Sequence, residues 1–343
     1  MTQFRILAGM FLLCFTLWLP VLPSAATDLK IATVVPDNSA WMVAMRHGGD
    51  EIRERTAGRV NLKFYGGGVM GNDQSVLRKI RIGQLQGGAF TAGGLSGVCP
   101  ELGLYSFPLL FKSTAEIDFV RLRRDPAMAA ALESAGFVSY GFAEGGFALL
   151  MSEGPVRTLE DLKGQKIWVP EGDVISYRTM QMLGLAPVSL PLTDVMTGLQ
   201  TGLVNIFASS PVGALAFQWY TRVGYITDLP LSYIYGALAL DHRAVARLAP
   251  ADQAVLQEVM GRIYREFDRK NREDNRAALQ VLLQQGLKLV TPQEAETRAW
   301  RARTSTLARQ LRDEGLFDGQ LFDRILQDLE ELRGRTAAVT DSR

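Results

Sequence analysis

The chain has 343 residues, of which 47% are hydrophobic and 21% are charged, and its formal net charge is +1. This composition is typical of a globular protein long enough for two domains, each with its own hydrophobic core. The near-neutral charge, with no basic cluster interleaved with aromatic residues, argues against nucleic acid as a partner.

Residues 1–26 have the pattern of a Sec-type signal peptide. Arg5 precedes an apolar run, Ile6–Leu19, and a run of small residues then ends at Ala26. A membrane anchor is the alternative, but about 14 apolar residues are few for a bilayer span, which takes roughly 20. We therefore expect cleavage after Ala26 and a soluble, periplasmic mature protein. Beyond this segment Cys99 is the only cysteine, which excludes an internal disulfide.

The first part of the mature chain alternates predicted strands with predicted helices. The expected strands are Leu29–Val35, Arg59–Tyr65 and Leu85–Thr91, and the expected helices are Ala40–Thr56, Asn72–Ile82 and Ser113–Glu133. The segment Tyr105–Phe111 contains Pro108, so we expect a loop or an edge strand there.

Three further β/α steps lie between residues 154 and 211. The expected strands are Lys166–Pro170, Ala186–Leu190 and Asn205–Ser209, and the expected helices are Val174–Leu183 and Asp194–Thr201. Short strands that alternate with helices of roughly ten residues indicate a parallel sheet. Ligands of such sheets bind beyond the carboxyl ends of the strands, which predicts a site at residues 168–171, 190–194 and 208–211.

Two extended stretches, Phe137–Ser152 and Gly224–Leu240, are much longer than a usual strand. Strands of this length can cross from one domain into the next, and Gly145, Gly146 and Gly236 are candidate hinge positions.

The segment Pro250–Gln285 reads as one helix, about 50 Å long at 1.5 Å per residue, which we expect to lie across both domains. The strand Leu287–Val290 and two helices, Pro292–Glu314 and Gly319–Leu332, complete the predicted elements.

Common catalytic and cofactor-binding motifs are missing from the sequence or incomplete in it. The segment Gly66–Gly71 fits GxGxxG, but no acidic residue follows at the distance that a ribose contact requires, so a flexible turn is the better interpretation. His47 and His242 are the only histidines and lie far apart, so no zinc site and no cofactor are expected. The carboxylates are not placed by any motif. We therefore expect a protein that is not an enzyme.

Trp168 is a candidate for lining a ligand pocket because it lies near the carboxyl end of a predicted parallel strand. Packing in the hydrophobic core is the alternative, and it is the more common role of a buried aromatic residue. The same two interpretations apply to other aromatic residues, where core packing is favoured: Trp41, Phe107, Phe147, Trp219 and Tyr235.

Several motifs together resemble the solute-binding proteins of TRAP (tripartite ATP-independent periplasmic) transporters, DctP type. They are TAGRV (56–60), PLLF (108–111), PVRTLEDLKGQK (155–166), LGLAPV (183–188) and LQTGLVN (199–205). The resemblance covers essentially the whole mature chain.

The resemblance implies an α/β, two-lobed periplasmic-binding-protein fold with crossing strands, a central cleft and a long helix that spans both lobes. We expect residues 27–145 and 236–260 in lobe I, and residues 146–235 and 261–343 in lobe II. The resemblance also implies a protein that binds a small organic solute and delivers it to the membrane subunits of a TRAP permease. We expect this protein to be a monomer. A ligand-sensing periplasmic subunit of a signalling system is the alternative.

The chain departs from the family where the family binds a carboxylate. Trp168 and Ala148 occupy positions at which family members carry arginine, and Ser209 and Ser210 replace an amide-containing stretch. Tryptophan offers one N–H and an apolar face instead of a charged fork. We therefore expect an aromatic, apolar or weakly charged solute beside Trp168, with polar contacts from Ser209 or Ser210.

The remaining expected contacts are Ala148, Phe147, Trp41, Asn205 and Tyr235. Arg178 could still hold a carboxylate, since the sequence does not determine its orientation.

Overall fold

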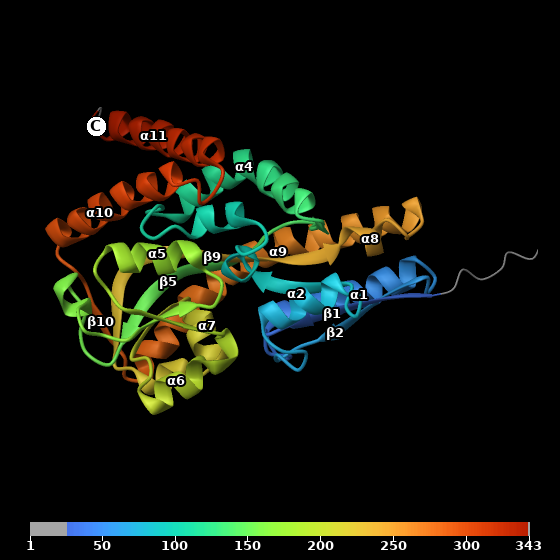
Figure 1. Cartoon of the computed structure of the whole chain (residues 1–343), viewed down its shortest axis with the longest axis horizontal. Helices are drawn as coiled ribbons and strands as arrows, with labels where there is room; N and C mark the ends of the chain where they lie inside the picture. Colours follow the sequence, from blue (N-terminus) through green and yellow to red (C-terminus); the bar gives the residue numbers. More distant parts are fainter. Residues whose placement is uncertain (1–25, 342–343) are drawn as a thin grey trace, which may run out of the picture.

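The computed structural model describes residues 26–341, so the predicted signal peptide lies almost entirely outside the described residues. Within this range ten strands form one mixed sheet with the order β2-β1-β3-β9-β5-β8-β6-β7, and β4 and β10 also pair with β9 (Figure 1). None of the helices in the described range is both long enough and apolar enough to span a bilayer.

The strands and helices follow the predicted alternation. The strands are β1 (Thr27–Thr33), β2 (Val60–Tyr65), β3 (Gly87–Thr91), β4 (Phe137–Val138), β5 (Ala143–Ser152), β6 (Ile167–Pro170), β7 (Pro187–Leu190), β8 (Ile206–Ser209), β9 (Tyr225–Asp241) and β10 (Lys288–Val290). The helices are α1 (Ala40–Arg55), α2 (Asp73–Arg81), α3 (Ala92–Leu95), α4 (Thr114–Ser134), α5 (Val174–Met182), α6 (Val195–Thr201), α7 (Pro211–Ala216), α8 (His242–Val245), α9 (Pro250–Gln284), α10 (Glu294–Asp313) and α11 (Gly319–Asp341). Short 3₁₀ turns cover Pro100–Ser106, Glu160–Leu162, Leu192–Asp194 and Trp219–Arg222.

The sheet has two parallel halves joined by the antiparallel strands β5 and β9. Strand β1 pairs in parallel with β2 and β3, and β6 pairs in parallel with β7 and β8. Strand β9 runs antiparallel to both β3 and β5, and β5 runs antiparallel to β8. The prediction of two crossing strands is therefore confirmed. The first stretch is interrupted between β4 and β5, and Tyr105–Phe111 is a 3₁₀ turn and loop rather than a strand.

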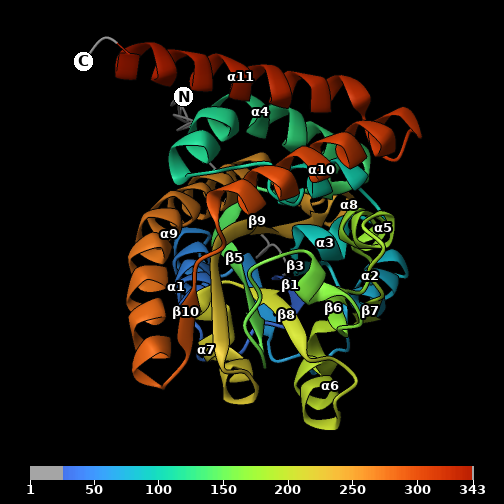
Figure 2. The same ribbon diagram turned by 90° about the vertical axis from the view of Figure 1, so that its left-hand side faces the viewer.

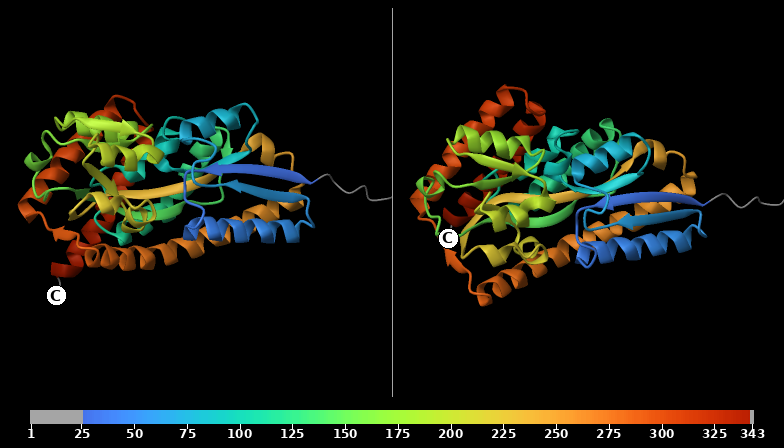
Figure 3. Two further views of the ribbon diagram at one scale, coloured as in Figure 1. Left: turned by 90° about the horizontal axis from the view of Figure 1, so that it is seen from below. Right: turned by 60° about the horizontal axis from the view of Figure 1, so that its bottom comes forward.

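Helix α9 runs along the length of the molecule and contacts both halves, as predicted (Figure 3). At its start Leu256, Val259 and Met260 pack against Met45 and Ile52 of α1 in one hydrophobic core. Towards its other end Asn275 accepts a hydrogen bond from the backbone N–H of Val212 in α7, at 3.2 Å.

The C-terminal helices cover one face and connect the two halves. Helix α11 lies beside α4 (Figure 2), where Arg124 pairs with Asp328 at 2.6 Å and Arg333 pairs with Glu116 at 2.7 Å. Helix α10 packs against α5. The segment that we assigned to lobe II therefore also contacts α4, which we assigned to lobe I, and the exact lobe boundaries stay a prediction.

Candidate functional site

A cavity of about 190 Å³ lies where the two halves of the sheet meet. Its lining comes from the carboxyl ends of β3, β6 and β8, from the starts of the helices that follow them, and from the crossing strands β5 and β9. This is the position expected for a ligand of parallel β/α units, because strand ends and helix N-termini converge there.

Three side chains at the rim cap the helices that leave the sheet. Thr91 accepts a hydrogen bond from the backbone N–H of Gly94 at 3.2 Å, and Asp173 accepts one from Ser176 at 3.0 Å. Ser210 accepts one from the backbone N–H of Gly213 at 3.2 Å. These caps begin α3, α5 and α7, so part of the polar lining stabilises the fold.

Two tryptophans form an aromatic wall of the cavity. The rings of Trp168 and Trp219 meet edge to face with centroids 5.2 Å apart, and Phe217 stacks on Trp219 at 5.0 Å. The indole N–H of Trp168 donates to the backbone carbonyl of Leu190 at 3.0 Å. Trp168 therefore offers a ligand its apolar surface and not its N–H.

Two tyrosines of β9 also contribute to the lining, and both of their hydroxyls are already engaged. The Tyr235 hydroxyl donates to the carbonyl of Leu102. The Tyr233 hydroxyl lies 2.9 Å from the Arg121 guanidinium and 3.3 Å from the Glu144 carboxylate. Burial raises the pKa of both tyrosines well above the usual value, so both remain protonated.

The structure brings five of the eight predicted residues together. Trp168, Ala148, Ser209, Ser210 and Tyr235 all line the cavity, although they come from strands β5, β6, β8 and β9 and from the turn into α7.

The other three predicted residues, Phe147, Trp41 and Asn205, do not line the cavity. Phe147 precedes Ala148 in β5, and successive side chains of a strand point to opposite faces. Trp41 packs against the core between α1 and α9. Asn205 lies at the start of β8, opposite to the cavity end, where it accepts from the Lys166 N–H and donates to Gln165, both at 2.9 Å.

Sequence reasoning missed Thr91, Asp173 and Ser232 as lining residues. Thr91 ends β3, so the strand-end rule that selected Trp168 would have selected it as well. Asp173 follows β6 immediately and precedes a helix, which is a capping signal. Ser232 had no comparable signal, because its place opposite Ala148 depends on the β5–β9 register.

The two halves touch beside the cavity. Asn72 at the start of α2 donates to the Glu171 carboxylate at 2.8 Å, and the Ser96 hydroxyl donates to the carbonyl of Gly172 at 2.5 Å. Near this contact, burial and the neighbouring Glu171 raise the pKa of Asp73 to about 6. The contact between the two halves therefore includes a carboxyl in a poorly solvated position.

The cavity lining contains no lysine, arginine or histidine among the residues described. Arg178 pairs with Glu314 at 2.7 Å, and its side chain is 41% exposed outside the cavity. Asp173 keeps accessible surface because it faces the cavity, but the surrounding protein atoms raise its pKa by desolvation. Within residues 26–341 no group of three or more His, Cys, Asp or Glu side chains is arranged to hold a metal ion.

A family profile described as bacterial extracellular solute-binding protein, family 7, matches residues 31–314. The chain belongs to this family. The family predicted from the sequence motifs is thus confirmed, and it is a family of solute-binding proteins.

Two curated relatives with named ligands match this family 7 protein. The 2,3-diketo-L-gulonate-binding periplasmic protein YiaO of Escherichia coli K12 is 26% identical over 183 residues, which is 53% of this chain and 56% of the relative. The C4-dicarboxylate-binding protein DctB of Bacillus subtilis 168 is 20% identical over 310 residues, which is 87% of this chain and 85% of the relative. The match spans 64% of a further relative, the uncharacterised protein YiiZ of Salmonella typhimurium LT2, so less than two thirds of YiiZ and of YiaO are covered.

Solved structures of TRAP periplasmic solute-binding proteins share the fold. The protein from Haemophilus influenzae with bound L-gulonate has a TM-score of 0.81 at 17% identity and covers 88% of this chain and 99% of its own. The sugar acid binding protein DctPAm from Advenella mimigardefordensis, in complex with galactonate, has a TM-score of 0.82 at 18% identity. The match covers 89% of this chain and 98% of that protein. The predicted two-lobed α/β fold is confirmed by this likeness.

Proposed function

We propose that this family 7 protein is an extracytoplasmic receptor that captures a small organic solute between its lobes and delivers it to a TRAP-type permease. The observation that carries the proposal is the cavity at the junction of two parallel β/α halves, which are linked by crossing strands and by α9. Binding proteins of this architecture close around ligands by hinge motion. The five lining residues Trp168, Ala148, Ser209, Ser210 and Tyr235 form the core of the proposed site.

The proposal includes export and the absence of catalysis. The protein is secreted to the periplasm after cleavage behind Ala26, acts as a monomer and binds its solute without chemical change. The lining supplies hydroxyls, aromatic rings and one carboxyl, Asp173, which caps a helix. The described lining residues include no histidine, lysine or cysteine, which are common general bases and nucleophiles.

Copurification tests the solute-capture part of the proposal. The full chain is expressed with its own N-terminal segment, purified from the periplasmic fraction without denaturation, and its small molecules are identified by mass spectrometry. Ala148→Leu is the cavity-filling variant, because Ala148 lines the cavity and is only 1% exposed. Ala44→Leu, at a position outside the cavity lining, is the matched control. A solute retained by the wild type and the control but lost from Ala148→Leu is expected, and no retained solute would count against capture.

Uptake separates the transport role from the signalling alternative. Cells that lack the gene should lose high-affinity uptake of the identified solute and regain it with the wild-type gene. Normal uptake together with a lost transcriptional response to the solute would favour the sensing subunit. Adjacent genes for a small and a large multi-span membrane protein would support transport.

Hinge closure predicts a change of shape on binding. Small-angle scattering of the ligand-free protein should give a larger radius of gyration than scattering with the identified solute at saturation. An unchanged profile would contradict closure.

A further inference from the structure

We propose that the cavity binds an uncharged, largely apolar molecule, slightly larger than benzene, that carries few hydrogen-bonding groups. This inference rests on the proposed receptor function and names the class of its solute. An engineered apolar cavity of about 150 Å³ binds benzene, which sets the size scale for the present 190 Å³. The four relatives and structures with named ligands described above bind sugar acids or C4-dicarboxylates, so this solute class would set the protein apart from them.

The charges around the cavity disfavour an anion. No cationic side chain of the described chain lines it, and the one acidic side chain that does is Asp173. Arg178, the basic residue that the sequence left open as a carboxylate partner, is paired with Glu314 outside the cavity. A carboxylate that entered would lose its hydration without gaining a cationic side chain as partner, and only the partial positive charge of the helix N-termini would offset this loss.

The polar groups of the lining are already largely satisfied within the protein. The Ser209 and Ser106 hydroxyls donate to backbone carbonyls at 3.2 Å and 2.8 Å, and the Tyr235 hydroxyl does the same. Thr91 and Ser210 accept from helix N–H groups at 3.2 Å each. Accepting leaves the O–H groups of Thr91 and Ser210 able to donate, so a polar ligand would find a small number of donors. An apolar ligand leaves the bonds within the protein intact.

One lining hydroxyl stands apart from this pattern. Of the hydroxyls that line the cavity in the described structure, that of Ser232 takes part in no hydrogen bond within the chain. Ser232 lies opposite Ala148 in the β5–β9 pairing. With Trp168 and Trp219 forming an aromatic wall elsewhere in the same cavity, Ser232 is a contact for a polar group of the solute.

Matched pairs of neutral and anionic probes test the proposal. Benzyl alcohol and benzoate form one pair, and hexan-1-ol and hexanoate form the other, with toluene, succinate and D-glucuronate as further probes. Binding to the mature protein is measured by calorimetry and by tryptophan fluorescence, since two tryptophans line the cavity. Each alcohol should bind at least about tenfold more tightly than its acid. Succinate and D-glucuronate should have dissociation constants above about 1 mM.

Three variants make the test specific. Ser232→Ala should weaken benzyl alcohol by about three- to tenfold and leave toluene unchanged, because one neutral hydrogen bond is lost. Trp168→Arg should strengthen benzoate by at least about tenfold and weaken toluene, since a cation then faces the cavity. Trp41→Phe, at a tryptophan outside the cavity, should change none of these affinities.

Two outcomes overturn the proposal: an acid that binds wild type more tightly than its alcohol, or no binding of any neutral probe at about 5 mM. Ser232→Ala removes only one hydroxyl, so it keeps the test valid if Trp168→Arg does not fold. The result is independent of the uptake experiment, because a transport failure with tight neutral binding would refute the delivery step and not the solute class.

Discussion

Replacing Glu144 by glutamine should destabilise the protein strongly, because Glu144 is the buried acceptor of a charged network between the crossing strands and α9. Its side chain is 1% exposed and accepts hydrogen bonds from Arg272 at 2.6–3.0 Å, and the Tyr233 hydroxyl lies 3.3 Å away. Breaking one partner of a buried ion pair typically costs about 3–5 kcal/mol. Arg272 keeps Asp118 at 2.6 Å and is 27% exposed, so we expect a loss of about 3 kcal/mol, at the lower end of that range.

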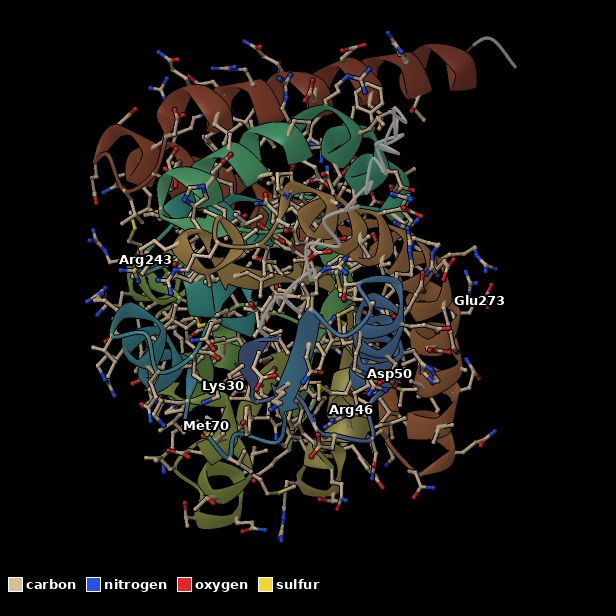
Figure 4. The ribbon with its side chains drawn as sticks, turned by 90° about the vertical axis from the view of Figure 1, so that its right-hand side faces the viewer. Lys30, Arg46, Asp50, Met70, Arg243 and Glu273 are labelled. Atoms are coloured by element: carbon tan, nitrogen blue, oxygen red, sulfur yellow. The ribbon has the colours of Figure 1, made fainter. Side chains whose placement is uncertain are left out.

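Thermal and urea denaturation of the mature protein, followed by circular dichroism, measure this loss. Glu273→Gln is the matched control, since Glu273 follows Arg272 on helix α9, is exposed and forms none of the ion pairs found within residues 26–341; it projects outward in Figure 4. The control should behave like the wild type. A Glu144→Gln variant within about 0.5 kcal/mol of the wild type would refute the reasoning, because that is the range of ordinary surface substitutions.

Three further predictions concern the crossing strand, the lobe contact and export. Gly236→Ala should lower the free energy of unfolding by about 1–3 kcal/mol, because a Cβ atom there would lie 2.4 Å from the backbone oxygen of Phe90; unchanged denaturation would contradict this. The raised pKa of Asp73, about 6, means that the folded state binds a proton at higher pH than the unfolded state, so stability should increase as the pH falls from 7 towards 4. Asp73→Asn should flatten this pH dependence and stabilise the protein at pH 7 by about 1–2 kcal/mol. This is less than the full pKa shift would give, because the Asp73 carboxyl keeps some accessible surface. A pH profile of stability identical to that of the wild type would refute this prediction. Intact-mass analysis of the periplasmic protein should give Thr27 as the first residue, and a chain retained in membranes with residues 1–26 would contradict export.

The structure also changes the interpretation of the predicted hinge glycines. Gly236 lies against the backbone of β3, so close packing explains its glycine without any hinge motion. Gly146 has φ = +93° next to a register shift in β5, a conformation that L-residues rarely adopt. Of these two positions, Gly146 is the one whose backbone conformation requires glycine.

The sequence by itself determined the class of fold and the family, because both depend on local periodicity and on contiguous motifs. Alternation of strands and helices predicted the parallel halves. Two unusually long extended stretches predicted the crossing strands, and the helical run Pro250–Gln285 predicted α9. The strand-end rule also placed Trp168, Ser209 and Ser210 at the cavity, since the carboxyl end of a parallel strand can be read from its boundaries.

Only the tertiary structure decided which neighbours in sequence share a site. Ala148 lines the cavity and Phe147 does not, because a one-residue difference reverses the face of a strand. Asn205 belongs to a recognisable motif but lies at the end of β8 opposite to the cavity, where it bonds Lys166 and Gln165. The predicted strand Asn205–Ser209 already places it there, so the strand-end rule would have excluded it. The pairing of Arg178 with Glu314 joins residues 136 positions apart and removes the one cation that the sequence had left for a carboxylate. Strand register and long-range ion pairs depend on contacts between distant segments, and no local pattern of residues encodes them.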